Sequence, residues 1–232
     1  MKLLIFLNKV YNKLSKTNVK LSFSQCGEDA ILLYLIHSLH LKSVQYFDIG
    51  TNDPRKMNNT YLMYLYNYRG VCVEPDPAFH REIRRRRPSD ILIRAGVSIE
   101  NIRTADFYIM DDSILNTFSR SEAEKMVREH GRQIKEKISV PLVSINEIFE
   151  HHYEKDKQLI ISLDAEGLDL PILQSLDFSK YRPAIICVET VAYSENLSGE
   201  KDRDIAKLLR GHRYSLYADT HINSIFLDNN LI

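Results

Sequence analysis

Short apolar segments that alternate with helical patterns constrain the fold of this chain more than any other feature. The apolar segments are rich in Val, Ile and Leu, and several of the helical patterns between them end at glycine or proline. The segments expected to form strands are 44–50, 71–76, 91–98, 159–167, 183–190 and two within 213–228. Because parallel strands need crossover connections, this alternation predicts an α/β fold with a mostly parallel sheet and helices on both faces.

The helices and the less regular middle of the chain complete this expectation. Helical patterns are expected at 31–41, 59–70, 78–87, 168–176 and 204–212. The middle of the chain predicts an added strand at 104–110, a charged helix at 119–137, and a strand followed by a helix within 138–153. Ser144 and Glu147 are spaced as a capping box for that last helix.

The composition fits one globular domain. With 232 residues, 44% of them hydrophobic, the chain can bury one sizeable core, so we expect one domain at 23–232 after a helical extension at 1–22. Lys plus Arg and Asp plus Glu both total 31, which argues against nucleic acid as a partner. The arginines at 84–87 are interpreted as a solvated helix end rather than an anion site. Three cysteines without a CxxC pair are typical of reduced thiols in a cytoplasmic protein.

The N-terminal segment 1–14 has an apolar run too short to span a membrane, and no small-residue cleavage site follows it. Its leucines alternate with Lys and Asn in the manner of an amphipathic helix. Such a helix could dock on the main domain, pair with another chain, or make peripheral contact with a membrane surface. The sequence favours the first two of these.

Polar residues, most of them acidic, follow the expected strands at the point where each strand ends. These residues are Asp48, Glu74, Ser98, Asp164 and Glu189. The carboxyl ends of parallel strands meet at one edge of a sheet, where ligands bind in open α/β folds, so we expect them to share a site. A glutamate at the end of the second strand is placed to accept hydrogen bonds from both hydroxyls of a nucleoside ribose.

The turn after the first strand discriminates between nucleoside cofactors. A pyrophosphate is typically bound by a G-x-G-x-x-G turn, whereas this turn reads G-T-N-D-P at 50–54. Asp53 adds negative charge and Pro54 removes an N–H donor. S-adenosylmethionine has no phosphate and carries a sulfonium cation, so the turn favours it over NAD. An NAD(P)-dependent oxidoreductase and a non-catalytic nucleoside-binding module remain the alternatives.

Several motifs in a fixed order also carry a family resemblance. They read "FSQCGEDAIL", "YFDIGTNDPRKMNNTYLMY", "RGVCVEPDP", "AGVS", "LNTFS" and "ISLDAEGLDLPILQSLDFSKYRPAIICVE". Over residues 23–190 the chain resembles the FkbM-type family of S-adenosylmethionine-dependent methyltransferases. The resemblance implies a class I methyltransferase sheet of seven strands with the last one antiparallel, S-adenosylmethionine as the methyl donor, and O-methylation of a sugar, glycan or other small metabolite.

Matching the family's motifs position by position implies a set of cofactor contacts. The turn with Asp48, Gly50 and Asn52 would surround the methionine moiety, and Glu74 would bind the ribose. Val97 and Ser98 would flank the adenine, and the element with Gln25 and Glu28 resembles a lid. The full set of implied cofactor contacts is Gln25, Glu28, Asp48, Gly50, Asn52, Thr60, Glu74, Pro75, Val97, Ser98 and Asp164.

Methyl transfer to a hydroxyl also needs a group that takes the hydroxyl proton. Asp164 and Glu166, in the D-x-E-G element, are the candidate catalytic residues, with an unassigned histidine as an alternative base. The same two acids could instead cap the helix that follows, since acids favour helix N-termini. Glu189 on the neighbouring strand raises the alternative of a hard cation such as Mg²⁺, and the sequence leaves metal binding unassigned.

Overall fold

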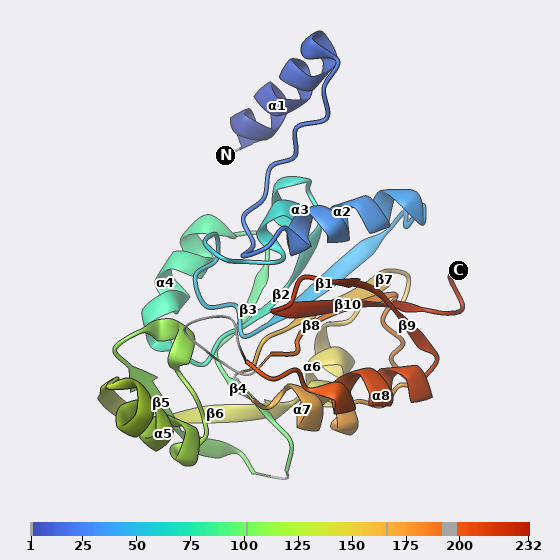
Figure 1. Cartoon of the computed structure of the whole chain (residues 1–232). Coiled ribbons are helices and arrows are strands. Elements are labelled where there is room, and N and C mark those ends of the chain that lie inside the picture. The colour runs from blue at the N-terminus through green and yellow to red at the C-terminus, as the bar shows by residue number, and fades with distance from the viewer. Residues whose placement is uncertain (1, 101, 166, 192–198) are drawn as a thin grey trace.

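A seven-stranded sheet forms the centre of the computed structural model, which describes residues 2–100, 102–165, 167–191 and 199–232 (Figure 1). Its strands are β1 (Val44–Ile49), β2 (Arg69–Val73), β3 (Ile91–Ile93), β7 (Gln158–Leu163), β8 (Ile185–Glu189), β9 (Tyr214–Asp219) and β10 (Asn223–Asp228). They lie in the order β3-β2-β1-β7-β8-β10-β9. Neighbouring strands are parallel except for β10, which is antiparallel to β8 and β9. The predicted sheet, mostly parallel with an antiparallel C-terminal strand, is confirmed.

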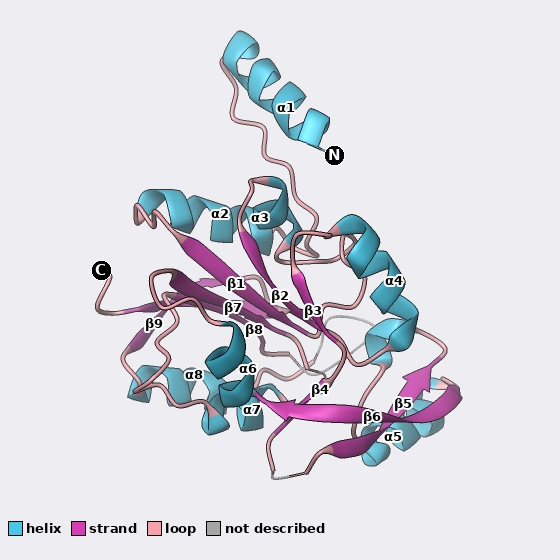
Figure 2. Cartoon of the chain, turned by 180° about the vertical axis from the view of Figure 1, so that it is seen from behind, coloured by secondary structure: helices cyan, strands magenta, loops and turns pink. Residues whose placement is uncertain are grey.

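Successive residues of β1 belong to two separate cores, because side chains alternate between the faces of a sheet along a strand. Tyr46 packs in one core and Phe47 in the other. The Tyr46 core is covered by α2 (Glu28–Ser38) and α3 (Tyr61–Leu65). The Phe47 core is covered by α6 (Ile145–His152), α7 (Asp169–Ser175) and α8 (Arg203–Gly211) (Figure 2). Helices therefore cover both faces of the sheet, as predicted.

A smaller sheet accounts for the irregular middle of the chain. Its strands are β4 (Gly96–Ser98), β5 (Thr104–Met110) and β6 (Ile134–Ser144), in the order β4-β6-β5. The single strand predicted at 91–98 was therefore wrong. The chain leaves the main sheet after β3, and β4 pairs with β6 instead. The short 3₁₀ helix η1 (Ser113–Leu115) follows β5 and lies against it.

The charged helix predicted at 119–137 is also too long. The observed helix, α5 (Arg120–His130), ends at Gly131, whose φ of +64° lies in the left-handed region that glycine adopts without strain. Ile134 then begins β6, which pairs with β5. The capping box at the start of α6 is confirmed, because the Ser144 hydroxyl oxygen accepts the backbone N–H of Glu147 and the Glu147 carboxylate accepts the backbone N–H of Ser144.

The remaining helices are α3, α4 and α1. The helix predicted at 59–70 is shorter than expected, because only α3 is helical and β2 already begins at Arg69. Helix α4 (Pro77–Arg86) lies beside β3 at the edge of the sheet (Figure 2). Helix α1 (Lys2–Ser15) projects from the rest of the molecule (Figure 1). Among the helices in the described ranges, none combines the length and the hydropathy that a membrane span requires.

Candidate functional site

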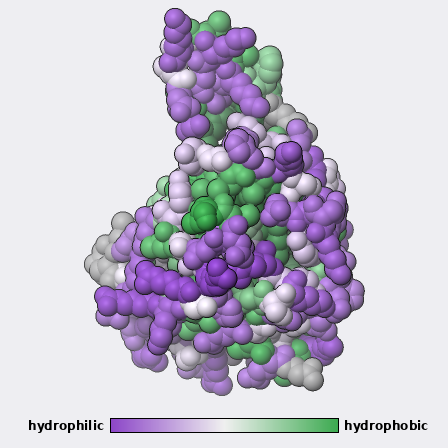
Figure 3. Space-filling view, turned by 90° about the vertical axis from the view of Figure 1, so that its right-hand side faces the viewer, coloured by the Kyte–Doolittle hydropathy of each residue, from purple (hydrophilic) through white to green (hydrophobic). Residues whose placement is uncertain are grey.

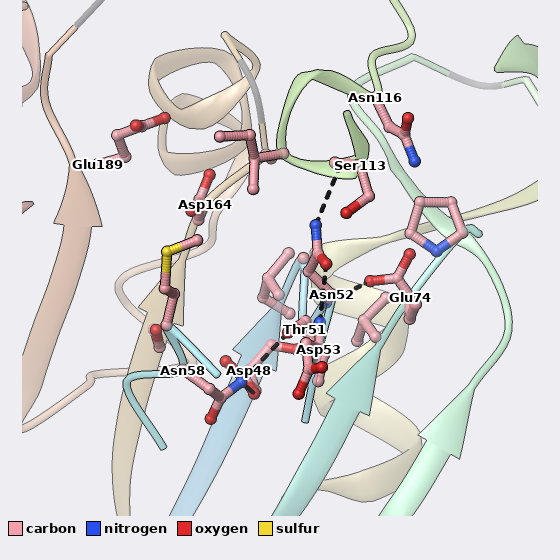
Figure 4. Close-up of a pocket in the computed structure, with 18 of the residues that line it drawn as sticks. Asp48, Thr51, Asn52, Asp53, Asn58, Glu74, Ser113, Asn116, Asp164 and Glu189 are labelled. Carbon is pink, nitrogen blue, oxygen red and sulfur yellow. Dashed lines mark hydrogen bonds between the residues drawn. The ribbon is translucent and has the colours of Figure 1, made fainter. Parts of the chain in front are cut away.

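A cavity of about 490 Å³ opens where β1, β2, β7 and β8 end (Figure 4). The described residues that line it include six carboxylates, on Asp48, Asp53, Glu74, Asp112, Asp164 and Glu189. Lys56 is the one lysine or arginine among these described lining residues. The parallel sheet thus brings four of the strand-end acids to one edge, and it gives the cavity a negative lining.

The turn after β1 fits its place between two neighbouring strands only with glycine at position 50. Gly50 has a φ of +77°, and a Cβ added to it would lie 1.8 Å from the carbonyl oxygen of Asp164. The Gly50 and Thr51 N–H groups donate to the carbonyl oxygen of Val73 at 3.0 and 3.2 Å. Asn52 follows with a φ of +50°. This turn therefore packs tightly against both β2 and β7 and forms the floor of the cavity.

Asp48 is held in a buried network around a guanidinium. Its Oδ2 accepts hydrogen bonds from Asn58 Nδ2 at 3.0 Å, Thr60 Oγ1 at 2.8 Å and Arg87 at 2.9 Å. Arg87 has no exposed surface, and its Nε donates to Asp90 Oδ2 at 2.8 Å. The Arg87 guanidinium thus bridges two buried carboxylates.

The burial of Arg87 corrects the interpretation of 84–87 as a solvated helix end. Arg84 and Arg85 are exposed, as expected, and Arg86 pairs with Glu82. Arg87 instead lies four residues after Ile83, the buried residue of α4, and therefore falls on the same side of the helix. This i, i+4 relation to Ile83 is the sequence signal that would have found it.

Glu74 is equally buried but has different partners. Its Oε2 accepts the backbone N–H of Asn52 at 2.6 Å, and its Oε1 accepts that of Asp76 at 2.7 Å (Figure 4). Burial raises the pKa of Glu74 to about 8, although these two hydrogen bonds act in the opposite direction. A carboxylate oxygen can accept two hydrogen bonds, so each oxygen keeps capacity for a ligand hydroxyl.

A segment that sequence reasoning gave no role closes the cavity above Glu74. The Asn52 side chain donates to the Ser113 carbonyl oxygen at 3.1 Å, and Asn116 Nδ2 donates to Asp76 Oδ2 at 2.9 Å. Figure 4 shows Ser113 and Asn116 on the same side of the cavity as Glu74, with Asp164 and Glu189 on the other. Asn116 belongs to the "LNTFS" motif, which was the only available signal.

The other residues predicted to contact a cofactor divide into two groups. Gln25, Pro75 and Val97 line the cavity, as do Gly50 and Asn52. Three further residues, Glu28, Thr60 and Ser98, are absent from the described lining of the cavity. Their side chains form hydrogen bonds with other residues of the chain instead.

These three side chains support the walls of the cavity. Glu28 accepts hydrogen bonds from Thr220 Oγ1 at 2.6 Å and Asn223 Nδ2 at 3.2 Å, which ties α2 to the β9–β10 turn. Thr60 belongs to the Arg87 network, and the Ser98 hydroxyl donates to the Glu100 carbonyl oxygen. The structure therefore does not place them in contact with a ligand in the cavity.

The D-x-E-G element contributes Asp164 to the cavity, while Glu166 lies outside the described residues. Sequence reasoning missed Asp169, a buried acid in the first turn of α7. Its Oδ1 accepts the N–H of Ala165 at 3.0 Å, so it holds the turn that carries Asp164. Burial first, and then the charge of Asp164, raise the pKa of Asp169 to about 7. Within the described ranges, no three His, Cys, Asp or Glu side chains come together as a metal site.

Comparison with known proteins gives a family match over most of the chain. A family model described as the methyltransferase FkbM domain matches residues 48–216. No curated protein matches the sequence. The matched range begins at Asp48 and contains Glu74, Asp164 and Glu189, so it includes the strand ends around the cavity.

Solved structures with similar folds include three methyltransferases. A TehB-like S-adenosylmethionine-dependent methyltransferase from Corynebacterium glutamicum is 8% identical, with 98% of each chain covered and a TM-score of 0.42. A putative caffeoyl-CoA O-methyltransferase from Staphylococcus aureus is 9% identical, covering 97% of this chain and 92% of its own, at a TM-score of 0.47. The O-methyltransferase TomG from Streptomyces achromogenes is 11% identical, covering 96% and 86%, at 0.42.

Proposed function

The chain belongs to the FkbM family of methyltransferases, and from this premise we propose that it methylates a hydroxyl group on a sugar, glycan or other small metabolite. It is an S-adenosylmethionine-dependent methyltransferase. The nature of the acceptor atom and the residues that act on it are the parts that we propose here.

The negative lining of the cavity is the observation that carries the proposal. Arg87 pairs with Asp48, and burial raises the pKa of Glu74 to about 8, so neither supplies free negative charge near neutral pH. The four other acids of the described lining, Asp53, Asp112, Asp164 and Glu189, still outnumber its one lysine around a volume of about 490 Å³. S-adenosylmethionine carries a sulfonium and an ammonium group, which such a lining attracts. The pyrophosphate of NAD(P) would be repelled by it, and the turn at 50–54 lacks the glycine pattern that would bind a pyrophosphate. The lining therefore supports this cofactor over a dinucleotide.

The residues present fit the cofactor along the length of the cavity. We assign the ribose hydroxyls to Glu74, the adenine to the wall with Pro75 and Val97, and the methionine end to Gly50, Asn52 and Asp164. Gln25 also lines the cavity. Asp48 also lines the cavity, but its carboxylate is paired with Arg87, so we assign it to the support of the turn and not to a cofactor group.

For the chemical step, the bound cofactor supplies a methyl group on a positively charged sulfur. The protein's part is to hold an acceptor hydroxyl in line with that methyl group and to take its proton. We propose Asp164 for this proton, because it lines the cavity opposite Glu74 (Figure 4). The charge of Asp164 is one cause of the raised pKa of Asp169, after burial, which shows that the two acids lie close together. Glu166, outside the described residues, is the second candidate base.

Labelled S-adenosylmethionine tests the proposal directly. The purified protein is incubated with glycan fractions and with pools of hydroxylated metabolites, and the labelled product is identified by mass spectrometry and NMR. We expect the label on an oxygen atom of a sugar or small metabolite. A product methylated on nitrogen or carbon, or labelled nucleic acid, would contradict the proposal.

Matched variants separate the two candidate bases. Asp164→Asn should lower both cofactor affinity and turnover, because this residue lies at the methionine end. If Glu166 is the base instead, Glu166→Gln should lower turnover by roughly 10² to 10⁴, the usual loss when a general base is removed, and leave cofactor binding nearly unchanged. Full turnover in Glu166→Gln would make Glu166 a helix cap. Asp177→Asn, at an exposed acid after α7, is the control for a change of one charge.

A further inference from the structure

Helix α1 meets the rest of the molecule with its polar side. Ile5 is 6% exposed, and Asn8 and Asn12 are half-buried. These residues are spaced i, i+3, i+7, so they lie along one face of the helix. Lys9 Nζ lies 4.5 Å from the centre of the Tyr66 ring, which adds a cation–π contact on the neighbouring flank. Apart from Ile5, the contact face is therefore polar.

The opposite face of α1 is apolar and points to solvent. Leu3, Leu7, Val10 and Leu14 follow the spacing 4, 3, 4 and form one stripe, which Leu4, Phe6 and Tyr11 widen. The side chains of Leu14, Leu3 and Phe6 are 78%, 67% and 61% exposed. Figure 3 shows the helix as a lobe at the top of the molecule. A helix on a protein in water normally buries its apolar face, and a contiguous exposed patch of this kind marks an interaction site.

The charge of this region indicates which partner fits the stripe. Residues 1–27 contain five lysines, at positions 2, 9, 13, 16 and 20, and no Asp or Glu. Acidic and basic residues are equal in number over the whole chain, so this positive charge is local to α1 and the segment that follows it. Lysines beside a Leu- and Phe-rich stripe are typical of helices that lie in the interface of an anionic bilayer.

We propose that α1 binds the surface of an anionic lipid bilayer, with the Leu3–Leu14 stripe at the boundary of the acyl chains and the lysines among the headgroups. Pairing with α1 of a second copy fits less well. A helix of 14 residues is too short to form a stable coiled coil by itself, and two copies would bring lysines together with no acids to pair with them.

A single tryptophan reports on this binding, because the chain contains none. Phe6→Trp places one in the apolar stripe, and Tyr217→Trp places one at an exposed site on β9 as the control. Vesicles of phosphatidylcholine with phosphatidylglycerol should shift the emission of Phe6→Trp to shorter wavelength. They should leave Tyr217→Trp unchanged, and vesicles of phosphatidylcholine alone or added salt should reduce the shift. An unshifted Phe6→Trp emission in anionic vesicles would overturn the proposal.

Charge insertion in the stripe supplies an independent test. Leu7→Glu combined with Leu14→Glu should weaken flotation with anionic vesicles by about tenfold or more, because each leucine loses its transfer into an apolar phase. Val127→Glu, at an exposed site on α5, should float like the unchanged protein. Both proteins should keep the same circular dichroism and melting temperature, since the substituted side chains are exposed. Unchanged flotation of the Leu7/Leu14 variant would overturn the proposal. The proposal would also be overturned if the unchanged protein did not bind vesicles but sedimented as a dimer, and if the two substitutions dissociated that dimer.

Discussion

Asp48 and Glu74 end adjacent parallel strands and look alike in the sequence, yet their surroundings differ. Asp48 accepts a hydrogen bond from the buried Arg87 guanidinium, together with Asn58 and Thr60. Glu74 accepts two backbone N–H groups and has a pKa raised to about 8. An acid paired with a buried cation contributes to the fold, whereas an acid held by backbone amides retains the capacity to bind a ligand.

The difference also predicts that one of these neighbouring acids contributes to stability and the other to ligand binding. A buried ion pair holds its partners strongly, because removal of either leaves the other charge uncompensated. A buried carboxylate without a cation destabilises the folded protein, and such acids are found mainly at functional sites. We therefore expect substitutions around Asp48 to act on folding and substitutions at Glu74 to act on the cofactor.

The largest effect is expected for Arg87→Met, which leaves the Asp48 and Asp90 carboxylates buried without their cation. Loss of one partner of a buried pair costs about 3–5 kcal/mol, so the free energy of unfolding in urea should fall by that amount. Arg86→Met is the control, because Arg86 pairs with Glu82 near the surface and should cost at most about 1 kcal/mol. Equal losses in the two variants would show that Arg87 behaves as a surface residue.

A double-mutant cycle measures the coupling between Asp48 and Arg87. Asp48→Asn should destabilise the protein containing Arg87 more than it destabilises Arg87→Met, because the amide no longer pairs with the guanidinium. Residues in direct contact show interaction energies of about 0.5–3 kcal/mol, and we expect a value in the upper half of that range from urea unfolding. Additive losses would contradict the ion pair as the reason for the burial of Arg87.

Per pH unit, the change of stability with pH should be smaller than either of these losses, and it should come from Glu74. Its pKa is raised from the ordinary value of 4.5 to about 8, so the folded state holds this proton more tightly than the unfolded state. The free energy of unfolding should therefore fall as the pH rises from about 4.5 to 8, by at most about 1.4 kcal/mol per pH unit. Glu74→Gln mimics the protonated acid at every pH, so the free energy of unfolding of this variant should lack the fall that Glu74 causes. Parallel pH profiles would contradict the raised pKa.

Much of the sheet could be predicted because its strands are continuous apolar runs, and the acids that follow them locate the cavity. The sequence could not show which acid has a cation, since Arg87 reaches Asp48 across 39 residues of chain. The first four residues of β6, 134–137, were assigned to the preceding helix because their charged sequence continues the pattern of that helix, whereas the rest of β6 was predicted as strand. Pairing with β5, a tertiary contact, decides between helix and strand. Asn116 closes the cavity through Asp76, another long-range contact.

Calorimetric titration with S-adenosylhomocysteine, the demethylated cofactor, tests the role of Glu74 most directly. The unchanged protein, Glu74→Gln and the exposed-site control Glu124→Gln are compared at pH 7 in buffers that differ in heat of ionisation. A hydrogen bond to a charged group contributes about 1.5–3 kcal/mol, so Glu74→Gln should bind at least about tenfold more weakly, while Glu124→Gln binds normally. Binding to the unchanged protein should release protons, because ribose hydroxyls favour the ionised carboxylate, and Glu74→Gln should lack this release. Equal affinity of the unchanged protein and Glu74→Gln would contradict the account and place the ribose elsewhere.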